Sequence, residues 1–147
     1  MSEMLGNQYF MARNYSAAQK EFEEVLIKYP ENRSAIKKLV VCYTQTGRLK
    51  ESFSYFIEII RSDIELIIKT DPNNDDCPCL ELIEKLEPKN KDKADTFEYN
   101  LVMGIIWLYC NVHNSLEYFT KLREMDPTNH EIKEVCSQIE LYLHPVG

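Results

Sequence analysis

The fold is decided by residues 5–30, LGNQYFMARNYSAAQKEFEEVLIKYP, which carry the pattern of two helices joined by a short turn. In the first helix, apolar residues recur at helical spacing at Leu5, Tyr9 and Phe10. After a break at Arg13-Asn14, the second helix has one apolar face, formed by Ala17, Ala18, Phe22, Val25 and Leu26. Asn14 or Ser16 is the expected N-cap of this helix, and Pro30 ends the unit because proline cannot continue a helix.

The same design recurs twice further along the chain. After Pro30, a first helix is predicted from Ile36, Leu39, Val40 and Tyr43, and a second from Ser52, Phe53, Phe56, Ile59 and Ile60. Gly47 lies between them and is expected to take the left-handed conformation that ends a helix. A third copy, whose inter-helix turn is one residue shorter, consists of Met103, Gly104, Trp107, Ser115, Phe119, Leu122 and Pro127.

These residues resemble a known family. Leu5-Gly6-x-x-Tyr9, Ala18-x-x-x-Phe22 and Pro30 are similar to the signature of the tetratricopeptide repeat (TPR), which has a period of about 34 residues. At that period the second copy places Leu39, Tyr43, Ser52 and Phe56 on the same pattern. The resemblance covers about two-thirds of the chain. It implies an all-α, right-handed stack of helical hairpins that bury a continuous core between neighbours.

We therefore expect a single TPR-like helical domain over residues 1–147. Its parts are repeat 1 (1–32), repeat 2 with an extended second helix (33–70), an insertion (71–96), repeat 3 (97–129) and a capping helix (130–143). Within the insertion, a short helix is predicted from Leu80, Leu82, Ile83 and Leu86, between a loop at 73–76 and a polar linker at 89–93. A capping box formed by Thr128 and Glu131 is expected to open the last helix.

Composition excludes several classes of protein. With 147 residues, 44% hydrophobic, 28% charged and only 4 Gly, the chain is long and apolar enough for one helical domain. A net charge of −7 without a basic run argues against binding to nucleic acid or to an anionic membrane. We expect a soluble, cytoplasmic protein, because neither a signal peptide nor a membrane-spanning run is visible. Five cysteines, an odd number, favour reduced thiols over a disulfide framework.

The resemblance also implies where a partner binds. In the family, the first helix of each repeat lines a concave groove that holds a partner helix or an extended peptide. Carried over position by position, the groove would be lined by Met4, Asn7, Phe10, Met11, Lys37, Lys38, Val41, Gln45, Leu101, Val102, Ile105 and Tyr109. Because this lining is largely apolar, it favours an amphipathic helix as the occupant. The predicted function is thus that of a non-catalytic scaffold or adaptor for another protein.

One subtype of the family clamps the acidic tail of heat-shock chaperones with Lys, Arg and Asn side chains. Asn7 matches that set, but Glu3 and Glu98 stand where cations would be needed. Two carboxylates would repel a carboxylate ligand, so we do not expect such a tail as the partner.

Two alternatives to an open groove remain. The same apolar residues could simply be core, covered by the insertion or the capping helix, because a monomer seldom exposes a large apolar surface. Alternatively, the groove could close on a second copy of the chain, which would make the protein a homodimer or a self-assembly module of a larger complex. The first repeat has almost no residues before it, so we expect that end of the stack to be open.

The sharpest chemical alternative is Cys77-Pro78-Cys79, which follows Asp75 and Asp76. Zinc sites prefer two or more residues between paired cysteines and need two further ligands, and no second paired spacing occurs in the chain. A redox C-x-x-C, a glycine-rich phosphate loop, H-E-x-x-H and G-x-S-x-G are all absent from the sequence. We therefore expect no enzyme activity, no metal and no cofactor.

Overall fold

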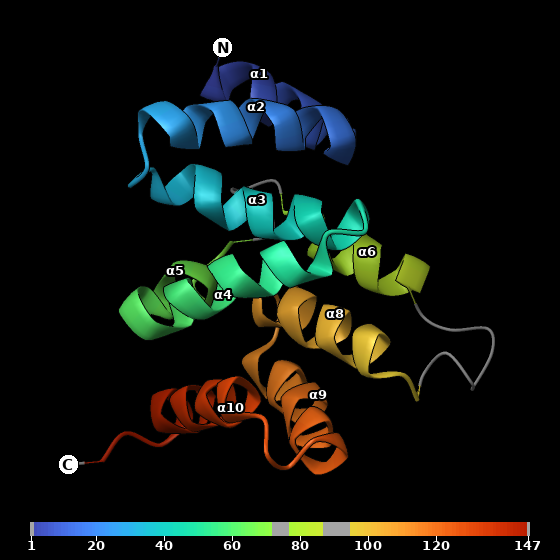
Figure 1. The fold of residues 1–147 in the computed structure, drawn as a ribbon, viewed down its shortest axis with the longest axis vertical. Coiled ribbons are helices and arrows are strands. Elements are labelled where there is room, and N and C mark those ends of the chain that lie inside the picture. The colour runs from blue at the N-terminus through green and yellow to red at the C-terminus, as the bar shows by residue number, and fades with distance from the viewer. Residues whose placement is uncertain (1, 72–76, 87–94, 147) are drawn as a thin grey trace. The chain divides into compact units, whose positions relative to one another are not determined.

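The chain was analysed as a computed structural model, which describes residues 2–71, 77–86 and 95–146. Within these ranges all regular secondary structure is helical, which confirms the all-α class. The helices are α1 (Glu3–Met11), α2 (Tyr15–Lys28), α3 (Arg33–Gln45), α4 (Leu49–Asp63), α5 (Glu65–Ile68), α6 (Cys79–Leu86), α8 (Phe97–Leu108), α9 (Val112–Met125) and α10 (His130–Leu143) (Figure 1). None of the helices described is both long and apolar enough to cross a membrane.

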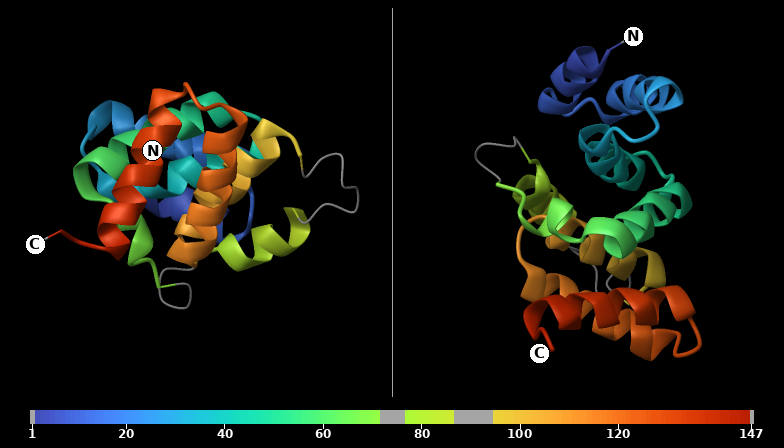
Figure 2. Two further views of the ribbon diagram at one scale, coloured as in Figure 1. Left: turned by 90° about the horizontal axis from the view of Figure 1, so that it is seen from below. Right: turned by 90° about the vertical axis from the view of Figure 1, so that its left-hand side faces the viewer.

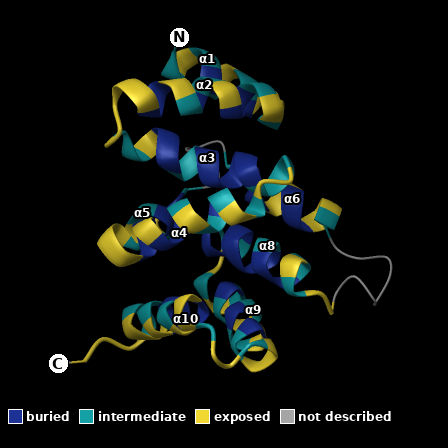
Figure 3. Cartoon of the chain, viewed as in Figure 1, coloured by how far each residue is buried: buried dark blue, intermediate teal, exposed yellow. Residues whose placement is uncertain are grey.

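Two compact units divide the chain, Met1–Glu58 and Ile59–Gly147, and the boundary falls inside α4. In each unit the helices have a buried face and an exposed face, as Figure 3 shows. The first unit contains α1, α2, α3 and most of α4, and the second contains the remaining helices.

In the first unit, asparagine side chains start α2 and α3. The Asn14 side-chain oxygen accepts a hydrogen bond from the Ala17 amide at 3.2 Å, so Asn14 is the N-cap of α2, one of the two residues expected. Asn32, which follows Pro30, caps α3 in the same way by accepting from the Ala35 amide at 3.0 Å. Both side chains satisfy backbone N–H groups that have no partner inside the helix.

The two turns of the first unit have the same backbone conformation. Gly47 has φ +75°, as predicted, and Arg13 holds the corresponding place between α1 and α2 with φ +62°. In each turn the next amide donates back to the carbonyl five residues earlier, from Asn14 to Tyr9 at 2.8 Å and from Arg48 to Tyr43 at 2.9 Å. This is the Schellman closure of a helix, which needs a residue in the left-handed region.

The core of the first unit depends on small residues where helices meet. Ala18 and Phe22 of α2 are fully buried, and a Cβ atom built on Gly6 of α1 would lie 2.8 Å from Cε1 of Phe22. Between α3 and α4, the buried Ser52 hydroxyl donates to the Val40 carbonyl at 2.8 Å. Only a small residue lets two helices approach so closely, which explains the sequence pattern.

The second unit repeats this contact in α8 and α9. A Cβ atom built on Gly104 would lie 2.8 Å from Cε2 of the buried Phe119. The Ser115 hydroxyl donates to the Gly104 carbonyl at 2.7 Å, as the Ser52 hydroxyl does to the Val40 carbonyl in the first unit. The connection between these helices has three residues, as does the one between α1 and α2, but here the Asn111 amide donates to the Trp107 carbonyl only four residues back, at 2.7 Å.

The last helix, α10, packs against α9 (Figure 2). Its bounds, His130–Leu143, agree with the prediction, and its buried face is formed by Ile132, Val135, Cys136 and Ile139. The predicted capping box was wrong. Asn129, not Thr128, is the N-cap, because its side-chain oxygen accepts from the Ile132 amide at 3.1 Å.

Between the helix pairs, the predicted extension of the second helix of repeat 2 is present but interrupted. The helix α4 ends at Asp63, and α5 follows after Ile64. The short helix predicted in the insertion is α6, which packs against α8 and buries Cys79, Leu82 and Ile83. The predicted loop at 73–76 and linker at 89–93 lie outside the described residues.

Candidate functional site

The first candidate site is a face of α1 that exposes two methionines. Met4 is 69% exposed and Met11 is 62% exposed, whereas Phe10 of the same helix is 3% exposed. Met4, Asn7 and Met11 are spaced by three and four residues, so they lie on one face of the helix. All three were predicted to contact a partner.

A hydrogen bond joins this face to α3. The Lys38 ammonium donates to the Asn7 side-chain oxygen at 2.7 Å, and both side chains are half-buried. Nearby, the Asn32 side-chain amide donates to a Glu3 carboxylate oxygen at 2.9 Å. These two bonds link α1 to α3 and to the N-cap of α3, so the side chains that form them lie at a shared surface. The structure thus brings together Asn7 and Lys38, two of the predicted groove residues.

The other predicted groove residues divide by burial. Lys37 and Gln45 of α3 and Val102 of α8 are half-buried. Five are core residues, each exposed by 6% or less: Phe10, Val41, Leu101, Ile105 and Tyr109. A side chain buried to this degree cannot contact a partner unless the structure changes. For these five, the arrangement matches the alternative in which the apolar residues form core.

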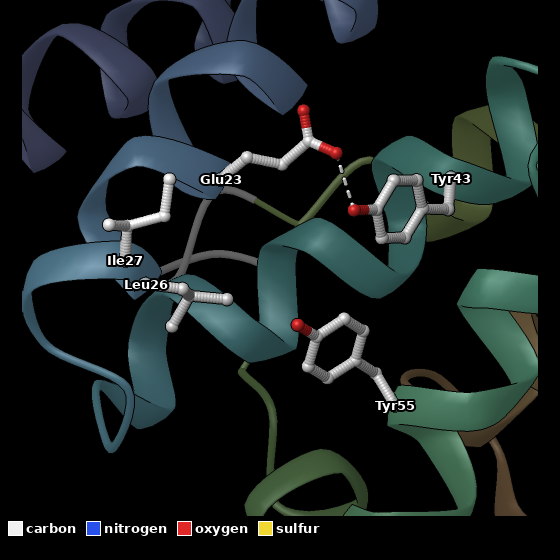
Figure 4. Close-up of a pocket in the computed structure, with 5 residues that line it drawn as sticks. All are labelled: Glu23, Leu26, Ile27, Tyr43 and Tyr55. Carbon is white, nitrogen blue, oxygen red and sulfur yellow. Dashed lines mark hydrogen bonds between the residues drawn. The ribbon is translucent and has the colours of Figure 1, made fainter.

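A second candidate site is a hollow of about 450 Å³ in the first unit. It is lined by Glu23, Leu26 and Ile27 of α2, Tyr43 of α3 and Tyr55 of α4 (Figure 4). The two tyrosine rings lie 6.3 Å apart between centroids with 15° between their planes, so they are close to parallel. Ile27 is 83% exposed and adds an apolar edge.

A hydrogen bond joins two of the residues that line this hollow. The Tyr43 hydroxyl donates to a Glu23 carboxylate oxygen at 2.6 Å, as Figure 4 shows. Burial of Tyr43, together with this hydrogen bond, raises the pKa of its hydroxyl above the usual range. The Arg48 guanidinium also lies over the Tyr43 ring, 5.8 Å from its centroid. The sequence analysis missed this hollow because it used Tyr43 only as part of the apolar pattern of its helix, and no motif marks Glu23 or Tyr55.

The second unit contains a group of three cysteines. The Cys77 thiol donates a hydrogen bond to the Cys79 sulfur at 2.7 Å, and Cys110 forms a further hydrogen bond with Cys79. Cys79 is 1% exposed, whereas Cys77 and Cys110 are half-buried. The sequence analysis considered Cys77 and Cys79 but not Cys110, which is distant in sequence. Within the described ranges, no group of three or more Cys, His, Asp or Glu is arranged to hold a metal ion.

The candidate sites are thus the exposed face of α1 and the hollow in the first unit, and the group of three cysteines in the second. The α1 face combines large exposed apolar side chains with a fixed polar contact, which suits binding to another protein. In the hollow, a carboxylate lies beside two aromatic rings. Comparison of the chain with protein-family models, with curated proteins and with solved structures found no match in any of the three.

Proposed function

We propose that this chain is a non-catalytic protein-binding module of TPR-like helix pairs, whose α1 and α3 hold an amphipathic helix or an extended peptide of a partner. The observation that carries the proposal is the exposure of Met4 and Met11 on one face of α1. They lie seven residues apart, two helical turns, which is the spacing at which a partner helix presents its own apolar anchors. Flexible methionines can adjust to the shape of the partner surface.

The hydrogen bond from Lys38 to Asn7 supports the assignment of this surface as the binding site. It places a cation beside the methionines, so a partner with apolar side chains flanked by a carboxylate would fit both features. Lys37, half-buried on the same helix, adds a second cation. The tail-clamp function remains disfavoured, because Glu3 lies at the same surface and would repel a terminal carboxylate.

The TPR-like part of the proposal rests on the contacts that the helix pairs share. Gly6 against Phe22 and Gly104 against Phe119 are equivalent positions of the repeat pattern, as are Ser52 and Ser115 with their hydrogen bonds to a facing carbonyl. Such equivalence is what a repeated supersecondary unit would produce.

The proposal can be tested by affinity capture and mass spectrometry with matched surface variants of the full chain. A Met4→Glu, Met11→Glu variant places two carboxylates on the proposed surface. Ile27→Glu is its control, because Ile27 is equally exposed and apolar but lies at the hollow. Circular dichroism checks that each variant is folded. We expect a partner that binds the wild type and Ile27→Glu but not the double variant.

Other outcomes of this experiment would change the assignment. Loss of binding in Ile27→Glu alone would move the site to the hollow, and retention in both variants would exclude the two surfaces of the first unit. Self-assembly is the alternative function, because the exposed methionines could equally meet those of a second copy. Sedimentation analysis distinguishes it, since a dimer that dissociates in the double variant would favour self-assembly.

A further inference from the structure

The three cysteines of the second unit lie where two helices meet. Cys79 is the first residue of α6, and Cys110 follows the end of α8, against which α6 packs. The Cys77 and Cys79 sulfurs are in direct contact, 2.7 Å apart, and a disulfide would require them to approach further, to 2.03–2.05 Å. The chain therefore already holds these two sulfurs against each other.

The surroundings of Cys79 favour its thiolate. Hydrogen bonds from the Cys110 and Cys77 thiols, and then from the backbone amides of Leu80 and Cys79, lower the pKa of Cys79 to about 4. The amides belong to the beginning of α6, where the N–H groups of a helix have no partner inside it. The pKa of Cys110 is raised by its hydrogen bond to Cys79 and by burial, so Cys110 keeps its proton and remains a donor.

The two remaining cysteines provide an internal contrast. Cys42 in the first unit is fully buried, and burial raises its pKa to about 12. Cys136 in α10 is also fully buried, and burial raises its pKa. Both have the character of structural cysteines, which react slowly because they remain thiols. Any oxidation should therefore be selective for the group of three.

We propose that Cys77, Cys79 and Cys110 form an oxidation-sensitive site, in which a hydroperoxide converts Cys77 and Cys79 to a disulfide and Cys110 acts as the hydrogen-bond donor that holds Cys79 ready to react. This chemistry differs from the proposed binding function and lies in the other unit. It requires neither a metal nor a cofactor.

The reaction proceeds in two steps that balance. Cys77, which is more exposed than Cys79, loses its proton to solvent, and its sulfur attacks one peroxide oxygen. An S–O bond forms, the O–O bond breaks, and the departing hydroxide takes up that proton from solvent as water. The Cys79 thiolate then attacks the Cys77 sulfenic acid, so that the S–S bond forms and the S–O bond breaks with release of hydroxide. The two sulfurs lose two electrons in total, and the peroxide gains two.

The test treats the full-length protein with hydrogen peroxide, alkylates the remaining thiols and maps the peptides without reduction. Trypsin places Cys77 and Cys79 on one peptide, Thr70–Lys85, which contains no other cysteine. We expect this peptide to lose two hydrogens and both alkylation sites, and to recover them after reduction. Cys42 and Cys136 should remain alkylated throughout.

Two variants examine the roles separately. Cys79→Ser keeps the size of the side chain, and with it we expect oxidation to stop at a Cys77 sulfenic acid that dimedone traps. Cys110→Ala removes one donor, so the thiolate absorbance that disappears in the wild type as the pH falls through about 4 should disappear at higher pH. Cys136→Ala is the control for loss of a cysteine in the same unit and should leave this titration unchanged.

Several results would overturn the proposal. Oxidation of Cys77 and Cys79 no faster than that of Cys42 and Cys136 would show that the three cysteines have no special reactivity. A disulfide from Cys79 to Cys110 would show that the reacting pair is assigned incorrectly. Stoichiometric metal in the purified protein that is lost in a Cys77→Ser, Cys79→Ser variant would replace the oxidation site by a metal site.

Discussion

The pairs α1/α2 and α8/α9 lie in different units, yet both are built around a glycine in contact with a buried phenylalanine. Gly6 lies against Phe22, and Gly104 lies against Phe119. The turns differ: after α1, Arg13 is left-handed and the Asn14 amide donates five residues back, whereas after α8 the Asn111 amide donates only four residues back. The comparison shows that the close contact between helices is kept while the connection varies. Packing, rather than the turn, therefore defines the pair.

The units also differ in charge. Residues 1–58 contain eight Lys and Arg against seven Glu, and residues 59–147 contain nine Lys and Arg against seventeen Asp and Glu. The acidic excess of the chain thus belongs entirely to the second unit. Long-range repulsion of a partner with acidic groups would therefore come mainly from the second unit.

The largest expected effect on this comparison comes from removing the phenylalanine rings. Phe22→Ala and Phe119→Ala should each cost about 3–5 kcal/mol of unfolding free energy, because both rings are fully buried and would leave cavities. Denaturant unfolding monitored by circular dichroism measures the cost. If the unfolding free energy fell by less than about 1 kcal/mol in one of the two variants, the helix pairs would not be equivalent, since removing a fully buried ring should cost far more.

Filling the space at the glycines gives the next largest effect. In Gly6→Ala and Gly104→Ala the new Cβ would lie 2.8 Å from a ring carbon, so the ring or a helix must move. We expect a net destabilisation of about 1–2 kcal/mol, since overpacking exceeds the better helix propensity of alanine.

Replacing the phenylalanine by the smaller leucine provides the control for the glycine substitutions. Phe22→Leu combined with Gly6→Ala, and Phe119→Leu combined with Gly104→Ala, should cost less than the sum of the single changes, because leucine leaves room for the added methyl. Additive costs in a double-mutant cycle would contradict direct contact between the two positions.

Removing the serine hydroxyls at the helix contacts should have a smaller effect on stability. Ser115→Ala removes the hydrogen bond to the Gly104 carbonyl, and Ser52→Ala removes the one to the Val40 carbonyl. Each should lower the unfolding free energy by about 1 kcal/mol, the net contribution of one buried hydrogen bond. Ala18 at the equivalent place in α2 shows that alanine fits there. Thermal unfolding of both variants measures this loss. Destabilisation of only one of them would show that the two serines are not equivalent.

Substitutions in the two turns should have the smallest effects on the unfolding free energy, and these effects should have opposite signs. Arg13→Gly should stabilise the protein by less than about 1 kcal/mol, because glycine adopts a positive φ without strain, although a hydrogen bond from the Arg13 side chain to the Phe10 carbonyl is lost. Gly47→Ala should destabilise it by about 1 kcal/mol for the reverse reason. Equal signs in denaturant unfolding would show that the two turns are not equivalent.

Much of the local structure could be predicted from sequence because it depends on nearby residues. Gly47 was expected to have a positive φ and the last helix to run from His130 to Leu143, and both were confirmed. Asn14 or Ser16 was expected to cap the second helix, and the cap is Asn14. Thr128 was assigned as a cap wrongly, because Thr128 and Asn129 are both good capping residues and the pattern alone does not decide which of them starts the helix.

The candidate sites depend on contacts between distant residues, which periodicity does not encode. Met11 and Phe10 are neighbours with similar hydrophobicity, yet one is exposed and the other is core, because Phe10 packs on the rings of Tyr15 and Phe22. Cys110 joins Cys77 and Cys79 only because α6 packs against α8. The hollow beside Tyr55 likewise requires three helices to meet.

The central claim is that α1 and α3 together bind a partner. Hydrogen–deuterium exchange of the wild-type chain, with and without a protein recovered by affinity capture, tests it most directly. We expect slower amide exchange in Glu3–Met11 and Arg33–Gln45 when the partner is present, because binding holds both helices closed. Unchanged exchange in these two helices, with protection confined to the second unit, would contradict the account.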